Sequence, residues 1–243
     1  MNSSPVESEE PVSPSCRCLI LDHDDTAVNS TALIHYPSHV ESMRLLRPKA
    51  TVIDLDGWFL KNFEPGIMHY LQDELGLNEQ ELETEYRIWR EYNTSRIPPF
   101  FPGFLETLRA FRARGGIITV VSHSEEDIIL KAYRNTDGGS VLPDLVFGWD
   151  YDETRRKPSP WPVQRILNAF DLSPEQALIV DDLKPGFLMS RVTGVPIAAA
   201  GWAHRIPEIH TYMRENCDLY FTSVEQFRAF VLGDETGNQR FPE

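Results

Sequence analysis

Acidic side chains follow two apolar segments that lie far apart in the chain. Asp22 and Asp24 follow the first segment, and Asp181 and Asp182 follow the second. A carboxylate can attack phosphorus and form an aspartyl phosphate, while a second one two residues away can protonate the leaving oxygen and then activate water. Further carboxylates suit magnesium, a hard cation that prefers oxygen ligands. These acids therefore indicate phosphoryl-transfer chemistry.

A hydroxyl and a lysine stand between the two acidic pairs in the sequence. Ser122 and His123 end an apolar run, and Lys157 is followed by Pro158 and a helical pattern. A hydroxyl, an ammonium and free backbone amides can hold phosphoryl oxygens while charge redistributes during the reaction. The chain thus contains the remaining group types that phosphoryl transfer needs.

Strands that alternate with helices must position these groups. Amphipathic helical patterns, such as the one at 103–114, separate five short apolar runs that are typical of buried strands: Cys18–Leu21, Gly116–Val121, Ala177–Val180, Val195–Ala199 and Asp218–Phe221. This alternation predicts an α/β fold, a three-layer α/β/α Rossmann-like core with a parallel sheet covered on both faces. Ligands bind at the carboxyl ends of the strands in such sheets, where the acids above lie.

The segment from Ala27 to Phe100 interrupts the alternation with a mostly helical pattern. We expect one helix over 64–75, ending at Gly76, and another starting at 78–81, where Asn78 and Glu81 can form a capping box. The prolines of 97–102 cannot continue a helix. We therefore predict a mobile acidic tail at 1–15, a core formed by 16–26 and 101–243, and a helical cap at 27–100.

Composition excludes several other classes of protein. The chain has 243 residues, with 23 basic and 37 acidic side chains and a net charge of −14. An acidic surface argues against binding to nucleic acid or to anionic membranes. No apolar run approaches the roughly 20 residues that span a bilayer. The three cysteines form no disulfide framework, which suggests a reducing, cytoplasmic compartment.

Four motifs in a fixed order resemble those of the haloacid dehalogenase superfamily, which consists mostly of phosphatases. Each motif alone is weak evidence, but the four in order are strong, and the resemblance covers nearly everything from Cys16 to Leu232. The motifs are a strand followed by Asp22, Asp24 and Thr26, a strand ending at Ser122, the lysine Lys157 before a helix, and a strand ending at Asp181 and Asp182. The insert between the first two motifs resembles the helical type 1 cap of this superfamily.

The resemblance implies a role for each acid. Asp22 would be the nucleophile and Asp24 the general acid and base. Mg²⁺ would be bound by the carboxylates of Asp22 and Asp181 and by the backbone carbonyl of Asp24, and Asp182 would bind it directly or through water. An aspartate in the position of Asp24 argues against true dehalogenation.

The resemblance also assigns the phosphoryl-binding groups, namely Ser122, the backbone amide of His123, and Lys157. Two departures from the pattern affect the site. Asp25 stands where the family commonly has glycine, and Lys184-Pro185-Gly186 stands where it often has another aspartate.

A second stretch, 51–57, imitates the first motif because it contains Asp54, Asp56 and Gly57. Its apolar lead-in is short, and choosing it would leave the run at Cys18–Leu21 unexplained. We therefore place Asp54 and Asp56 in the cap, either in a turn or in contact with substrate.

Other residues receive simpler interpretations. We expect His204 and Arg205 to lie on the surface. We expect five cap aromatics to form the cap's own core rather than a substrate platform: Trp58, Phe59, Phe63, Trp89 and Tyr92.

The sequence therefore predicts a magnesium-dependent phosphatase that acts on a small phosphorylated metabolite. A sugar-phosphate mutase resembling beta-phosphoglucomutase would use the same motifs. A phosphonate hydrolase would need a Schiff-base lysine in the cap, where Lys49 and Lys61 are the candidates. A receiver-like or non-catalytic phosphoryl-binding protein is the alternative outside enzymes, although receivers place their acid pair first in the chain.

Overall fold

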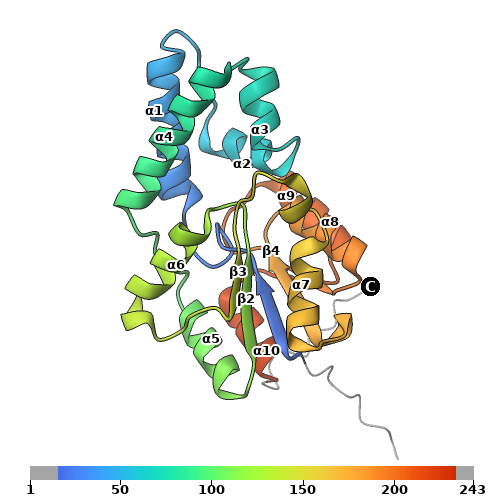
Figure 1. Cartoon of the computed structure of the whole chain (residues 1–243). Coiled ribbons are helices and arrows are strands. Elements are labelled where there is room, and N and C mark those ends of the chain that lie inside the picture. Colours follow the sequence, from blue (N-terminus) through green and yellow to red (C-terminus); the bar gives the residue numbers. More distant parts are fainter. Residues whose placement is uncertain (1–15, 234–243) are drawn as a thin grey trace, which may run out of the picture.

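A six-stranded, all-parallel sheet forms the centre of the computed structural model, which describes residues 16–233. The tail predicted at 1–15 lies outside the described residues. The strand order is β3-β2-β1-β4-β5-β6, as Figure 1 shows in part. The strands are β1 (Cys18–Leu21), β2 (Ile117–Val121), β3 (Leu145–Phe147), β4 (Ala177–Asp181), β5 (Ile197–Ala200) and β6 (Leu219–Phe221).

Helices cover both faces of this sheet, which confirms the predicted three-layer α/β/α architecture (Figure 1). Leu19 and Leu21 pack on one face and Ile20 on the other, as the two-residue period of a strand requires. The first face carries α5 (Phe104–Ala113), α6 (Glu126–Asn135) and α10 (Val224–Leu232). The second carries α7 (Trp161–Phe170), α8 (Lys184–Thr193) and α9 (Pro207–Asn216).

The first and fourth strands lie side by side at the centre of the sheet. In β1, Leu21 is in register with Val120 of β2 and with Val180 of β4. Chain order reverses at this point, because β2 and β3 extend to one side of β1 whereas β5 and β6 follow β4 on the other. The carboxyl ends of β1, β2 and β4 therefore meet at the topological switch point, where open α/β sheets bind ligands.

The predicted cap, residues 27–100, contains four helices that lie beyond this edge of the sheet (Figure 1). They are α1 (Tyr36–Leu46), α2 (Leu55–Phe63), α3 (Ile67–His69) and α4 (Glu79–Ser95). Thr31–His35 and Tyr70–Glu74 form π-helical turns. The capping box between Asn78 and Glu81 starts α4, as predicted. The division into domains itself stays a prediction.

Two elements differ from the sequence prediction. The helix expected over 64–75 begins only at Ile67, because Glu64 ends α2 and Gly66 has a φ of 106°. The third strand, β3, was not predicted. It has only three residues, and a run this short does not stand out from a loop.

The cap contacts the core through both apolar and charged side chains. Phe59 of α2 packs in a cluster with Ile206, Ile209 and Met213 of the core. Lys184 at the start of α8 pairs with Glu64, with 2.8 Å between Nζ and Oε2. These contacts hold α2 against the edge of the sheet where the acids lie.

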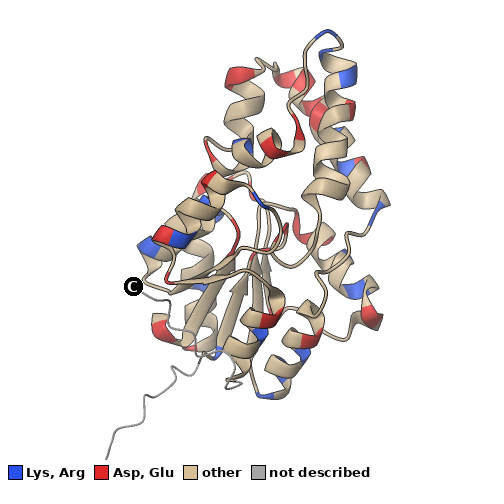
Figure 2. Ribbon diagram, turned by 180° about the vertical axis from the view of Figure 1, so that it is seen from behind, with Lys and Arg blue, Asp and Glu red and all other residues tan. Residues whose placement is uncertain are grey.

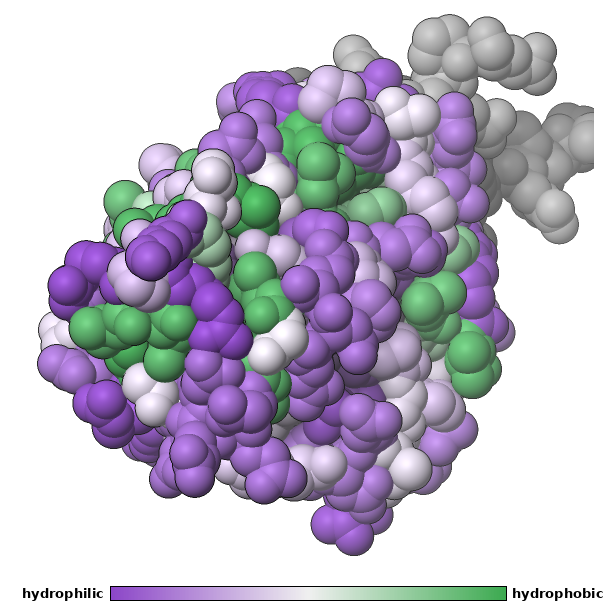
Figure 3. All heavy atoms as spheres, turned by 90° about the horizontal axis from the view of Figure 1, so that it is seen from above, coloured by the Kyte–Doolittle hydropathy of each residue, from purple (hydrophilic) through white to green (hydrophobic). Residues whose placement is uncertain are grey.

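The surface is mixed in character. Charged residues lie on helices and loops, whereas the strands are largely uncharged (Figure 2). Seen from above, hydrophobic residues form separate patches between hydrophilic ones (Figure 3). Within residues 16–233, no helix combines the length and apolar character that crossing a membrane requires. Cys16, Cys18 and Cys217 are free thiols.

Candidate active site

Three predicted metal ligands meet at the switch point of the sheet. Asp22 follows β1, and Asp181 and Asp182 end β4 or follow it directly. One carboxylate oxygen from each lies within 4.8 Å of the others, and all three residues are buried. Parallel strands in register deliver these side chains to one place, although the sequence separates them by about 160 residues.

Lys157 neutralises part of this negative charge. Its Nζ lies 2.5 Å from Oδ1 of Asp22 and 2.8 Å from Oδ2 of Asp181. Burial disfavours the lysine cation, but the two carboxylates outweigh it and raise the pKa of Lys157 above its usual range. The lysine therefore stays charged and holds Asp22 in place.

The acids still carry more negative charge than one lysine can balance. Burial raises the pKa of Asp22 to about 8, despite the opposing effect of Lys157. Burial, together with the charges of Asp22 and Asp181, also raises the pKa of Asp182 well above its ordinary value. A bound dication would reverse both shifts, because it favours the ionised carboxylates.

The donor set fits magnesium. Carboxylate oxygens are the ligands that this cation prefers. Oδ2 of Asp182 is buried and has no hydrogen-bond partner among the described residues, as expected of an atom that awaits a cation. Gly186 cradles Asp181, since a Cβ at this glycine would lie 2.3 Å from Oδ2 of the aspartate. Gly186, part of the segment that departs from the family pattern, therefore leaves room for the Asp181 carboxylate.

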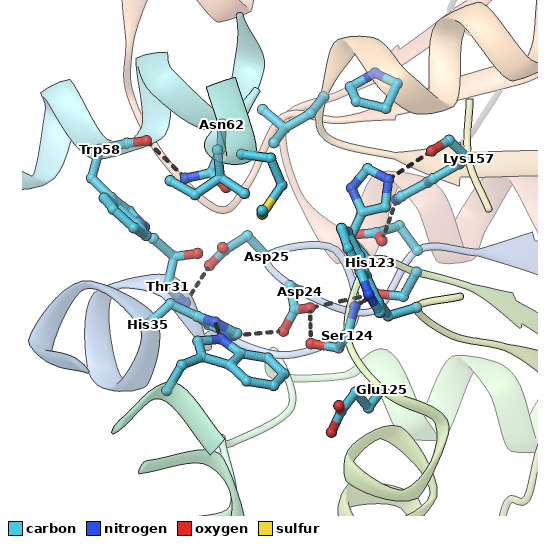
Figure 4. Close-up of a pocket in the computed structure, with 18 of the residues that line it drawn as sticks. Asp24, Asp25, Thr31, His35, Trp58, Asn62, His123, Ser124, Glu125 and Lys157 are labelled. Atoms are coloured by element: carbon cyan, nitrogen blue, oxygen red, sulfur yellow. Dashed lines mark hydrogen bonds and ion pairs between the residues drawn. The ribbon is translucent and has the colours of Figure 1, made fainter. Parts of the chain in front are cut away.

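Asp24 is surrounded by hydrogen-bond donors. Its Oδ1 accepts hydrogen bonds from Ser30 Oγ at 2.7 Å and His35 Nε2 at 3.0 Å. Its Oδ2 accepts one from Ser124 Oγ at 2.6 Å and a longer one from Ser122 Oγ at 3.4 Å. Burial opposes ionisation, but these groups outweigh it and hold the pKa of Asp24 well below its usual range. Figure 4 shows Asp24 between His35 and Ser124.

His35 links this carboxylate to the cap. The indole N–H of Trp89, on α4, donates to Nδ1 of His35 at 2.9 Å. Burial lowers the pKa of His35 and Asp24 raises it more strongly, so the net direction is upward. A cation would nevertheless place an N–H on Nδ1 opposite the indole N–H, which can only donate. The geometry therefore assigns the neutral tautomer, with Nε2–H directed at Asp24.

The predicted phosphoryl-binding residues all line the same cavity, but they differ in what they contact. Ser122 Oγ accepts a hydrogen bond from the backbone amide of Ser124 at 3.1 Å. The imidazole of His123 donates from Nε2 to the carbonyl of Lys157 at 2.7 Å, and burial lowers the pKa of this imidazole to about 4. His123 therefore remains neutral, and its ring orients the backbone of Lys157.

Asp25 shows why a family glycine can be replaced here. Its φ is 59°, in the left-handed region where glycine is favoured and aspartate is among the tolerated residues. Its Oδ1 accepts a hydrogen bond from the amide of Thr31 at 3.3 Å, which ties the first strand's loop to the start of the cap.

His204 contradicts the prediction of a surface role. Its side chain is only 6% exposed, and its Nε2 lies 3.7 Å from Oδ2 of Asp182. It also packs against the ring of Phe59 at 4.8 Å. The turn after β5 carries it inward, which no periodic pattern in the sequence indicates. Arg205 is exposed, as predicted.

The imitation motif lies away from the acids. Asp54 is the N-cap of α2 and accepts a hydrogen bond from the amide of Gly57 at 2.8 Å. Asp56 is exposed in the first turn of this helix, and neither aspartate lines the cavity. Of the two interpretations left open, the structure supports the turn.

A cavity of about 470 Å³ extends from the acids to the cap. Trp58, Phe59 and Trp89 line it, so these aromatics face the site as well as the cap's interior. Phe63 and Tyr92 do not line it. Trp58 also packs with Tyr70 and Leu71 inside the cap, as predicted, whereas Phe59 and Phe63 pack against residues outside the cap.

Three residues of the site were missed in the sequence. Ser124 could have been found as a second hydroxyl just beyond β2. His35 and Gly186 gave no usable signal, because a lone histidine or glycine in a helical pattern has many structural explanations.

Comparisons with known proteins agree with this architecture. The family model described as haloacid dehalogenase-like hydrolase matches residues 19–200. Phosphoglycolate phosphatase 1 of Pseudomonas aeruginosa is 22% identical over 241 residues, covering 90% of this chain and 84% of that protein. Pyrophosphatase PpaX of Bacillus thuringiensis is 27% identical over 126 residues, covering 51% of this chain and 56% of that protein.

Among solved structures, a hydrolase of the haloacid dehalogenase-like family from Streptococcus pneumoniae superposes with a TM-score of 0.70. The two sequences are 18% identical, and the match covers 89% of this chain and 98% of the other. At this identity, the likeness concerns the fold.

Proposed function

The chain belongs to the haloacid dehalogenase-like hydrolases, and we propose that it is a magnesium-dependent phosphatase that hydrolyses a phosphomonoester through an aspartyl phosphate. One observation carries the proposal: Asp22 and Asp24 share a buried site with two further acids and Lys157. The names of the two relatives support phosphate-ester or anhydride hydrolysis.

Asp22 is the nucleophile in this proposal. Lys157 binds its Oδ1, whereas Oδ2 accepts no hydrogen bond from residues 16–233. A carboxylate oxygen of Asp22 forms a bond to phosphorus as the bond to the ester oxygen breaks. Lys157 is placed to interact with the phosphoryl oxygens as their charge redistributes.

Asp24 serves the leaving group and then water. It protonates the ester oxygen as the alcohol departs, and as a carboxylate it later takes a proton from the attacking water. Its four hydrogen-bond donors, with Ser124 and His35 at 2.6 and 3.0 Å, fix the side chain for both transfers. They also favour the ionised form, which the second transfer requires, so Asp24 takes the proton for the first transfer from solvent or from the substrate's phosphoryl group before the ester bond breaks.

The carboxylates of Asp22, Asp181 and Asp182 would hold Mg²⁺, and the family resemblance adds the backbone carbonyl of Asp24. When bound there, the cation would supply positive charge that stabilises the transferring phosphoryl group and keeps the carboxylates ionised. The cap at 27–100 would exclude water from the site and select the substrate.

The proposal is tested with an aryl phosphate at saturating Mg²⁺, followed by trapping of the intermediate. We expect Mg²⁺-dependent release of phosphate and phosphate incorporation into Asp22, detected by mass spectrometry of the rapidly quenched enzyme. Full activity in excess EDTA would contradict the proposal. A reaction that interconverts hexose 1- and 6-phosphates and releases little phosphate would instead identify a mutase.

A further inference from the structure

The wall of the cavity is largely apolar on the side of the cap. Side chains from three cap helices and from the loop after β3 line it, among them Trp58 (α2), Met68 (α3), Leu82 (α4) and Trp149. Figure 4 shows Trp58 and Asn62 facing Asp24 and Asp25 across the cavity. The amide nitrogen of Asn62 donates to the carbonyl of Trp58 at 2.8 Å, which engages one of its two N–H groups.

The charged groups of the wall are all acidic. Glu83, Glu85 and Glu125 line the cavity, while the lining contributed by residues 16–233 includes a single lysine or arginine, Lys157. Lys157 lies among the acids at the sheet and is paired there with two carboxylates. No lysine or arginine of the described lining is therefore free to pair with a second anionic group of a substrate.

Nearby cations are committed outside the cavity. Arg90 pairs with Glu125 and with Asp127, and Tyr86 donates from its hydroxyl to Glu125. Lys184 pairs with Glu64. Recruiting either cation would break a contact between the cap and the core.

Glu83 and Glu85 are the acids of the described wall without such a partner, and Glu85 is the less exposed of the two. Glu85 makes no ion pair and no side-chain hydrogen bond among the described residues, and it lies half-buried on α4, one turn before Trp89. Burial raises the pKa of Glu85 to about 7. A substrate carboxylate beside Glu85 would face a carboxyl group rather than a cation.

The volume of the cavity also favours a large apolar occupant. A cavity of about 470 Å³ lies within the range of roughly 300–1,000 Å³ that is usual for sites of drug-sized ligands. A phosphoryl group bound at the acids would occupy only one end. The remaining space is bounded by indole rings and aliphatic side chains, which favour an apolar occupant.

We propose that this site selects phosphomonoesters whose alcohol part is bulky and apolar or aromatic, and that it discriminates against substrates with a second anionic group. The inference rests on the proposed phosphatase function and specifies its substrate class. The proposed substrate class differs from the substrates named for the two relatives. Phosphoglycolate carries a carboxylate, and pyrophosphate carries a second phosphoryl group.

The discrimination against a second anion and the preference for an apolar alcohol each have a physical basis. A second anion would lose its hydration without gaining a cationic partner, which is costly in a site of low polarity. A ring in contact with Trp58 and Leu82 would instead remove apolar surface from water.

A matched pair of esters tests the charge preference. Benzyl phosphate and 4-carboxybenzyl phosphate differ only in a carboxylate at the far end of the ring. At saturating Mg²⁺ we expect kcat/KM for the carboxylated ester to be lower by at least about 100-fold, and phosphoglycolate and pyrophosphate to be poorer still. Equal turnover of the pair, or a preference for phosphoglycolate, would overturn the inference.

Binding separates this inference from the catalytic proposal. Calorimetry with benzylphosphonate and 4-carboxybenzylphosphonate, which cannot be hydrolysed, should show the same preference. If no ester is turned over while the phosphonates still differ, the proposed hydrolysis is wrong and the ligand class stands. If the two phosphonates bind equally, the ligand class is wrong whatever the activity.

Charge reversal at Glu85 provides the sharper test. E85K should narrow the ratio between the two benzyl esters by at least about tenfold, mainly through the KM of the carboxylated ester. E91K is the matched control, because Glu91 lies on the same helix and does not line the cavity. E85Q, a milder change, should narrow the ratio less. If E85K and E91K have equal effects, the wall does not discriminate through Glu85.

Discussion

The two ends of the cavity are built in different ways. At the sheet, Asp22 and Asp181 lie buried at the ends of strands in fixed register. Lys157, from the segment before α7, forms ion pairs of 2.5 and 2.8 Å with them. At the cap, Trp58, Met68 and Leu82 project from helices and offer apolar surface. We call the first group, with Asp24 and Asp182, the acidic floor, and the cap side chains the apolar wall.

This difference separates chemistry from selection. Reacting groups must be held closely, and strand ends in a packed sheet provide such rigidity. The wall has only to exclude water and fit the alcohol, for which helices with exchangeable side chains suffice. The link from Trp89 through His35 to Asp24 is where the wall reaches the floor. Variants in the floor should therefore abolish turnover, whereas variants in the wall should modulate it.

The largest effect is expected in the floor. D22N keeps the shape of the side chain but removes the nucleophilic carboxylate, so kcat on an aryl phosphate should fall by at least about 10³-fold. Steady-state kinetics measure this, with thermal unfolding as a check on folding. Near-normal turnover of D22N would show that the floor does not provide the nucleophile.

A smaller effect on activity is expected from a change at Gly186, which packs against Asp181 of the floor. In G186A, the added Cβ would collide with Oδ2 of Asp181 and displace this carboxylate. The Mg²⁺ concentration for half-maximal activity should rise by about 10- to 100-fold, as is usual when the support of a ligand is lost. A Mg²⁺ titration of activity decides it. An unchanged midpoint would mean that Asp181 is not a ligand.

Breaking the link between wall and floor should have a smaller effect on activity than either of these changes. W89F keeps an aromatic ring but removes the N–H that orients His35, so kcat should fall by about three- to tenfold with little change in KM, since proton transfer by Asp24 loses part of its positioning. W149F is the matched control. Trp149 also lines the cavity, and its indole N–H makes no hydrogen bond with the described residues. Equal losses in kcat would indicate packing rather than orientation.

The smallest effect belongs to the imitation motif. D56N should change kcat on a small aryl phosphate by less than about tenfold, or roughly 1.4 kcal/mol in barrier, because Asp56 is exposed on α2 away from the cavity. Steady-state kinetics on the same ester compare kcat of D56N with kcat of D22N. Loss of turnover in D56N with activity retained in D22N would move the nucleophile to the cap.

Much of the floor was predictable from local patterns. Apolar runs that end in acids indicate buried strands, and parallel strands bring their carboxyl ends to one edge, so Asp22 and Asp181 were expected to meet. The helical content of 27–100 and the capping box at Asn78 followed from equally local signals. Strand β3 was too short to be recognised.

The wall was not predictable in the same way. Which face of a helix lines a cavity depends on what packs against its other faces, and the pattern of apolar residues does not distinguish a cap interior from a substrate wall. No sequence pattern therefore indicated that Trp58, Phe59 and Trp89 line the cavity. His204 was misassigned because a turn after β5 decides its direction.

The sequence by itself determined the fold class, the order of the motifs and the kind of chemistry, because these depend on residue types at short spacing and on the two-residue period of strands. Tertiary structure alone decided that Trp89 orients His35, 54 residues away in the chain, and that His35 reaches Asp24. It also decided that Gly186 supports Asp181 and that Glu85 stands in an apolar wall without a partner. Such contacts join segments distant in the chain, and only the packing of cap on core sets their distances.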